Sequence, residues 1–158
     1  MAKIVSKLLA ISLRKGSSFH LSILPLFPNI VLRELFIGFD PTHTPKSGKK
    51  TEGGGKFWSG YAGAPKWGLE VSGIAAIDLD SHTAMHLEAI QTLPEEGETL
   101  LESYAKALID RKNELQKISK VVVADAYFSK ETFVTLLCLV GFHLVSRLRD
   151  DARMTYTY

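Results

Sequence analysis

Two aspartates, Asp40 and Asp125, stand where carboxylates can act together, although 85 residues separate them along the chain. Asp40 ends the apolar run LFIGF, and Asp125 follows VVVA. Runs of this kind are typical of strands buried on both faces. If the two strands pair in parallel, the carboxylates lie side by side. The alternative is that Asp40 caps a Pro–Thr turn and Asp125 caps an Ala–Tyr turn.

Paired carboxylates on strand ends have a defined chemistry. Their oxygens are hard ligands, suited to Mg²⁺ or Mn²⁺ rather than to Zn²⁺. Two such ions about 4 Å apart activate a water or hydroxyl group and stabilise the leaving oxygen of a phosphodiester. The pair therefore indicates metal-dependent phosphoryl chemistry, with Mg²⁺ (or Mn²⁺) as the expected cofactor.

A basic stretch follows Asp40. Residues 41–70 carry five lysines against two acids, a net of +3, whereas residues 87–115 carry three bases against seven acids, a net of −4. The whole chain has a net charge of only +2, so the positive charge is concentrated near Asp40, where a polyanion could be held through its phosphates. The expected contacts are Lys46, Lys49, Lys50 and His43. The alternative is a solvated surface loop.

Periodicity and turn signals predict one α/β domain over residues 33–158, preceded by an unassigned segment over residues 1–32. The predicted strands cover 35–40, 67–80, 82–92, 119–125 and 142–149, with a long exposed loop over 41–56. A helix begins at Thr99, because Thr99 and Glu102 form a capping-box pattern. A second helix over 130–140 is expected to be capped by Ser129 and stopped by Gly141.

Several other residues bear on function. Trp67 is expected in the core, while Trp58 is left open between core packing and stacking on bases. Arg147 and Arg149 precede an acidic pair that forms either a solvated turn or, with the arginines, a contact to DNA phosphates. Cys138, the only cysteine, is expected in the core and forms no internal disulfide, which fits a reducing compartment.

The chain contains no signal-peptide pattern, and its apolar runs are shorter than the roughly 20 residues that a membrane span requires. A cytoplasmic protein without a membrane partner is therefore expected.

Three segments carry a resemblance to a known family. They are FDPTHTPKSGKKT, KFWSGYAGAPKWGLEVSGIAAIDLDSHTAMHLEAIQT and VVVADAYFSKETFVTLLCLVGFHLVSRLRDDA. In this order and spacing they resemble the catalytic domain of DDE transposases from bacterial insertion sequences. The resemblance implies a ribonuclease-H-like fold, a mixed five-stranded sheet with flanking helices. It makes Asp40 and Asp125 the first two acids of the metal-binding triad. It also implies DNA transposition by strand cleavage and strand transfer, with element ends and target DNA as partners.

The sequence departs from that family in one respect. The third acid should be a glutamate on a helix beyond the last strand, but no Glu follows Glu131, which is too early for that role. The expectation is a domain truncated before its last catalytic helix, an incomplete copy whose enzymatic activity stays open. The rivals are a catalytically inert remnant and a non-catalytic DNA-binding or inhibitory partner of an intact transposase. A homo-oligomer is a further expected assembly.

Overall fold

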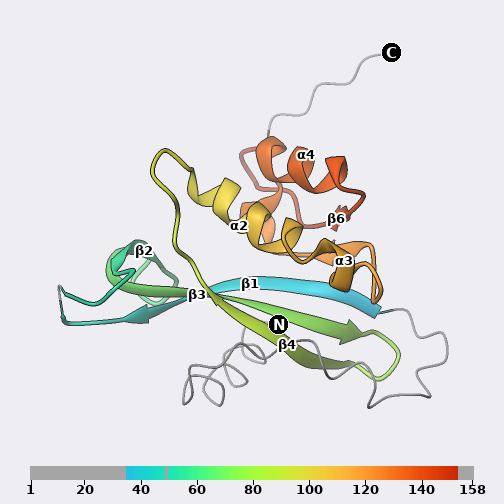
Figure 1. The fold of residues 1–158 in the computed structure, drawn as a ribbon, viewed down its shortest axis with the longest axis horizontal. Coiled ribbons are helices and arrows are strands. Elements are labelled where there is room, and N and C mark those ends of the chain that lie inside the picture. Colours follow the sequence, from blue (N-terminus) through green and yellow to red (C-terminus); the bar gives the residue numbers. More distant parts are fainter. Residues whose placement is uncertain (1–34, 49, 153–158) are drawn as a thin grey trace.

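The computed structural model describes residues 35–48 and 50–152 of the 158-residue chain. It has a mixed α/β architecture, as predicted, with a six-stranded sheet and its helices gathered on one side (Figure 1). The strands are β1 (Leu35–Pro45), β2 (Gly55–Ser59), β3 (Ala64–Asp78), β4 (Thr83–Gln91), β5 (Val121–Val123) and β6 (His143–Val145). The helices are α2 (Leu100–Ile109), α3 (Lys112–Leu115), the 3₁₀ turn η2 (Ala126–Phe128) and α4 (Glu131–Leu139).

The sheet has the order β2-β3-β1-β5-β6, and β4 pairs with β3 off this path. Strands β1, β2 and β4 run antiparallel to β3, whereas β5 runs parallel to β1 and β6 runs parallel to β5. Gly68 pairs with Pro45 of β1 and with Gly55 of β2, so these two strands lie on opposite edges of β3. The parallel pairing of β1 with β5 confirms the pairing that was expected between strands 35–40 and 119–125.

The predicted loop over 41–56 is wrong at both ends, because β1 continues through Pro45 and β2 begins at Gly55, whereas the described residues between these strands form a loop as predicted. Pro41 and Pro45 lie four residues apart, so their missing N–H groups fall on the same edge of the strand. Strand β5 pairs with β1 only at Ile37 and Gly38, which leaves that edge without a strand beyond them. The long partner β3 therefore keeps the proline-bearing segment extended.

The core lies between the sheet and the helices. Apolar side chains of β1, β3, β4 and β5 meet those of α2, α3, η2 and α4 in one cluster. Its aromatic members make edge contacts, with ring centroids 5.9 Å apart for Phe39 and Tyr104 and 5.4 Å apart for Phe39 and Phe128. Because Phe39 directly precedes Asp40, this packing fixes the backbone at the position of that carboxylate.

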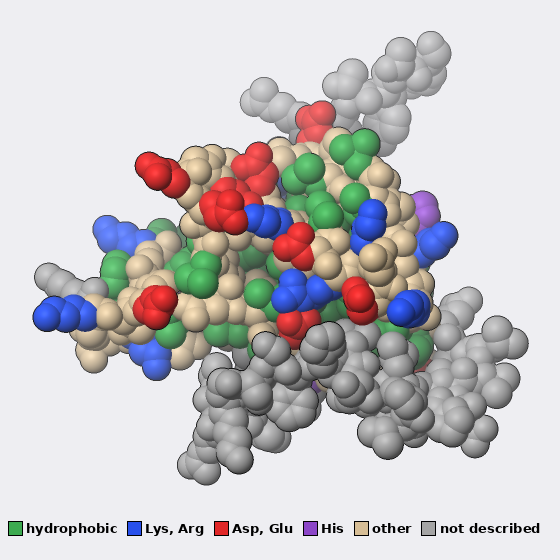
Figure 2. Space-filling view, viewed as in Figure 1, with side chains coloured by type: hydrophobic (Ala, Val, Ile, Leu, Met, Phe, Trp, Pro, Cys, Tyr) green, Lys and Arg blue, Asp and Glu red, His purple; other side chains and the backbone are tan. Residues whose placement is uncertain are grey.

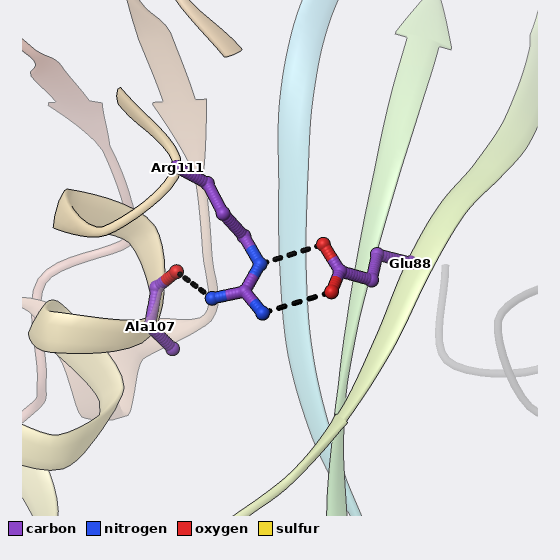
Figure 3. Close-up of polar contacts among 3 residues, drawn as sticks. All are labelled: Glu88, Ala107 and Arg111. Atoms are coloured by element: carbon purple, nitrogen blue, oxygen red, sulfur yellow. Dashed lines mark hydrogen bonds and ion pairs between the residues drawn. The ribbon is translucent and has the colours of Figure 1, made fainter. Parts of the chain in front are cut away.

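Strand β4 contains a β-bulge, and next to it Glu88 contacts the helical layer. Ile74 pairs with Glu88 and Ala75 pairs with His86, so β4 has one extra residue. Glu88 accepts two hydrogen bonds from Arg111, at 2.6 and 2.8 Å, and Arg111 also donates to the Ala107 carbonyl at 3.1 Å (Figure 3). The C-terminal end of α2 is thus tied to the sheet.

The helix ends show which local signals were correct. The capping box of Thr99 and Glu102 is present. Gly141 follows α4 with φ 85°, in the left-handed region that glycine adopts readily, which confirms the predicted stop. The Ser129 cap is wrong, because Lys130 occupies the N-cap position.

The Ser129 hydroxyl instead donates to the Ala126 carbonyl, inside the preceding turn. Cys138 is exposed on α4, so the expectation of a core position is also wrong. No helix within the described part of the chain is long and apolar enough to cross a membrane.

Candidate functional site

The register of β1 and β5 brings the two predicted carboxylates together. Ile37 pairs with Val122 and Gly38 with Val123, an offset of 85 residues. The same offset, continued two residues past the end of β5 at Val123, places Asp125 beside Asp40, and the charge of Asp125 acts on Asp40. This arrangement is the one expected from the two apolar runs.

Asp40 is a half-buried carboxylate whose charged form is unfavourable. Burial, and after it the negative charge of Asp125, raise the pKa of Asp40 from 3.8 to about 6. Asp40 lies within β1 opposite Gly73, so the alternative of a Pro–Thr turn cap is wrong. No residue in the described ranges donates a hydrogen bond to its carboxylate. A cation close to the pair would stabilise the ionised form.

Asp125 is exposed and is held by local hydrogen bonds. Its Oδ1 accepts a hydrogen bond from the Tyr127 N–H at 2.9 Å, and its main-chain carbonyl accepts one from the Ser146 hydroxyl at 2.6 Å. Asp125 is therefore the N-cap of η2, which bears out the turn-capping alternative for this residue. Capping uses one carboxylate oxygen and fixes the side chain, so it is compatible with a second role.

The donor set fits a hard cation in part. Among the described residues, no group of three or more His, Cys, Asp or Glu side chains can hold a metal ion. Mg²⁺, however, commonly keeps several waters and is bound through one or two carboxylates together with substrate phosphates. Asp40 and Asp125 supply that minimum.

The predicted phosphate-binding loop lies elsewhere. Six residues separate Asp40 from Lys46 along an extended strand, which corresponds to about 20 Å. Lys46 and Lys50 are exposed at the far end of β1, so the expectation that they flank Asp40 is wrong; Lys49 lies outside the described residues. Their binding to DNA stays a prediction, now at a separate surface.

His43 lies opposite Glu70 on β3 and alternates in the strand with Asp40, so it lies on the other face of the sheet. Its Nε2 is buried and has no hydrogen-bond partner among the described residues. A Cβ atom on Gly68 would lie 2.5 Å from that nitrogen, so His43 packs closely over the glycine. The Nε2 atom of His43 is therefore not accessible for the expected contact with a phosphate.

Two arginines lie at the same edge as the carboxylates. Val123 pairs with Val145, and the chain continues from β6 to Arg147 and Arg149. Arg149 forms two hydrogen bonds to Asp151, both at 2.7 Å, and Arg147 lies 3.8 Å from Asp150. A phosphate would compete with these exposed acids, so both alternatives for this turn stay open.

A buried acid–phenol pair was missed by the sequence predictions. Glu70 and Tyr104 are 4% and 3% exposed, and the Tyr104 hydroxyl donates to Glu70 Oε1 at 2.5 Å. Burial raises the pKa of Glu70, and the hydrogen bonds from Tyr104 and Thr92 oppose this rise. Burial and then the negative charge of Glu70 raise the pKa of Tyr127, the residue whose N–H binds Asp125. The charge of Glu70 therefore acts on a residue that contacts the carboxylate site.

No protein-family model, curated protein or solved structure matches this chain. The function is therefore inferred from its own residues and geometry.

Proposed function

We propose that this chain carries the first two carboxylates of a DDE-type transposase catalytic domain with a ribonuclease-H-like fold. It acts on DNA through Mg²⁺- or Mn²⁺-dependent strand cleavage and strand transfer. One observation carries the proposal: β1 and β5 pair in parallel, and their register, continued two residues past the end of β5, brings Asp125 beside Asp40. The raised pKa of Asp40 supports it, since burial and the charge of Asp125 make the ionised pair costly without a cation.

The architecture supports the fold part of the proposal. The five strands expected from the sequence are all present, with antiparallel pairing among β1, β3 and β4 and parallel pairing from β1 to β5 and from β5 to β6. Helices α2 and α4 pack against the sheet through the core cluster. The added strand β2 extends the far end of β3, away from the carboxylates.

The chain's own residues position the chemistry. Asp40 and Asp125 would hold the cation, which when bound supplies activation of a water or hydroxyl group and stabilises the leaving oxygen. The Tyr127 N–H and the Ser146 hydroxyl hold Asp125 in place. Arg147 and Arg149, which follow β6, would provide positive charge at this edge of the sheet for binding a DNA phosphate.

The resemblance assigns the third acid to a glutamate beyond the last strand, and these 158 residues contain no Glu after Glu131. Two carboxylates hold a divalent cation more weakly than three, because fewer charged oxygens replace its hydration shell. The chain by itself is therefore expected to bind metal weakly and to cut DNA slowly.

A plasmid-nicking assay tests this function. The purified full chain is incubated with supercoiled DNA in Mg²⁺ or Mn²⁺, and the expected result is slow conversion to nicked circles that stops with EDTA. D40N and D125N abolish the conversion. The matched control D80N removes a carboxylate from the exposed turn after β3, and this variant should still convert supercoiled DNA to nicked circles.

Two results would contradict the proposal. Nicking that persists in both D40N and D125N would show that the carboxylate pair does not perform it. A folded chain that fails to nick in either metal would favour the inert remnant. In that case, metal-independent and salt-sensitive DNA binding would favour the non-catalytic partner instead.

A further inference from the structure

The β2–β3 ribbon carries both tryptophans of the chain on one face. Lys56 pairs with Trp67, and Trp58 pairs with Pro65. Directly opposed residues share a face, and so do residues two apart along a strand. Lys56, Trp58 and Trp67 therefore lie on one face, whereas Phe57 points to the other and is 7% exposed.

These aromatic rings are open to solvent. Trp58 is 61% exposed, Trp67 is 38% exposed, and Tyr61 at the tip of the ribbon is fully exposed. The Trp67 indole is also held in place. Its Nε1–H donates to the Gly48 carbonyl at 3.1 Å, and a Cβ on Gly54 would lie 2.8 Å from its Cζ2. The ring is thus preorganised while part of its surface stays free.

Lysines add positive charge beside the same face. Between residues 46 and 66 the sequence holds five lysines and a single acid, Glu52; of these lysines, Lys66 pairs with Phe57 and so lies on the opposite face. Figure 2 shows basic side chains at the end of the molecule that carries β2, as well as at its middle and opposite end, while acidic side chains gather over α2. The hydrogen bond from Trp67 to Gly48 brings the loop of Lys46 and Lys50 against the indole.

We propose that this aromatic and basic face, defined by Trp58, Tyr61, Trp67, Lys46, Lys50 and Lys56, binds single-stranded DNA. Exposed rings stack on unpaired bases, and lysines beside them neutralise the phosphates. A duplex hides the faces of its bases and offers only its backbone and groove edges, so it is the weaker ligand. This surface goes beyond the metal-dependent chemistry and does not depend on it. It lies about 17 Å from Asp40, since five residues of β1 separate Asp40 from the Pro45–Gly68 pair.

Tryptophan fluorescence reports on this face alone, because the chain has no other tryptophan. The full chain is titrated in EDTA with an oligothymidylate of about 16 nucleotides, a length that spans one single-strand site. Saturable quenching is expected, with weaker binding to a duplex of equal length. W58A weakens affinity roughly 5- to 140-fold, the effect of one lost base–aromatic stack, and W58F largely retains it.

Salt dependence tests the lysines. Three phosphate contacts predict a slope of log affinity against log salt of about −2, and K56Q reduces that slope by about 0.7. Control variants away from the face, L139A on α4 and K117Q after α3, leave affinity unchanged; Leu139 is 77% exposed, so its truncation removes no core contact.

Three outcomes would overturn the assignment. They are unchanged fluorescence at saturating oligonucleotide, equal affinity of W58A and wild type, and tighter binding to duplex than to single strand. A concentration-dependent dimer that W58A disrupts, without any DNA effect, would assign the face to a second copy of the chain. Because EDTA is present, binding and nicking succeed or fail separately.

Discussion

Replacing Asp40 with asparagine is expected to stabilise the fold at neutral pH, the opposite of what most substitutions at half-buried positions do. Burial and the charge of Asp125 raise the pKa of Asp40 to about 6 in the folded state, against 3.8 as the ordinary value. The folded chain therefore holds this proton more tightly than the unfolded chain. D40N removes the ionisation and keeps the size of the side chain.

The sign and size of the change in the free energy of unfolding follow from this difference in pKa between the folded and unfolded states. As pH rises from about 4 to about 6, the unfolded state loses the proton first, so the free energy of unfolding of the wild type falls. The full difference corresponds to about 3 kcal/mol, at 1.36 kcal/mol for each pKa unit. Asp40 is only half-buried, so solvent screening reduces this figure, and the asparagine amide, which has no described partner, reduces it further. We expect D40N to be more stable by about 1–2 kcal/mol at pH 7 and to lose that advantage near pH 4.

Urea denaturation of both proteins at about pH 7.5 and about pH 4, without divalent cations, measures the effect. D80N is the matched control, because Asp80 is exposed, and its stability should stay within about 0.5 kcal/mol of the wild type at both pH values. The reasoning is refuted if D40N is less stable than the wild type at pH 7.5, or if the difference between them does not change with pH.

Three further substitutions test the contacts around the site. Tyr104→Phe removes one of the two hydroxyl donors to the buried Glu70 and should lower the free energy of unfolding by about 1–3 kcal/mol at neutral pH, measured by urea denaturation. Arg111→Ala removes two hydrogen bonds to the half-buried Glu88 and should cost about 2 kcal/mol in the same assay. Gly68→Ala would place a Cβ 2.4 Å from a backbone carbonyl oxygen and should lower the midpoint of thermal unfolding, with a cost of about 2 kcal/mol.

Each of these has a control elsewhere in the chain. Tyr61→Phe removes a hydroxyl from a fully exposed ring, and Lys106→Ala removes an exposed ion pair with Glu95; neither should change stability measurably. Gly60→Ala adds a Cβ that meets no atom within 4 Å. If a test substitution proves as neutral as its control, the contact assigned to it does not stabilise the fold.

Local signals in the sequence predicted much of the fold because the structure uses them locally. The Thr99–Glu102 capping box and the Gly141 stop each act within a few residues. The β1 extension and β2 were missed for the opposite reason. Pro41 and Pro45 read as turn residues, and only the long antiparallel partner β3 together with the strand-free edge of β1 keeps them extended.

The site divides in the same way. Asp40 and Asp125 could be found because each ends an apolar run, and parallel pairing then brings such ends together. Glu70 and Tyr104 gave no local signal, since 34 residues separate them and the packing of α2 on the sheet creates their contact. The lysines were misplaced because an extended segment, unlike a loop, carries the chain about 20 Å away.

Binding of Mn²⁺ tests the central claim most directly. The loss of the free-ion electron paramagnetic resonance signal is measured as Mn²⁺ is titrated into wild type, D40N, D125N and D80N. The carboxylate pair predicts weak, saturable binding in the wild type and in D80N and its loss in both D40N and D125N. Equal binding by all four proteins, or none by the folded wild type, would contradict a metal centre at Asp40 and Asp125.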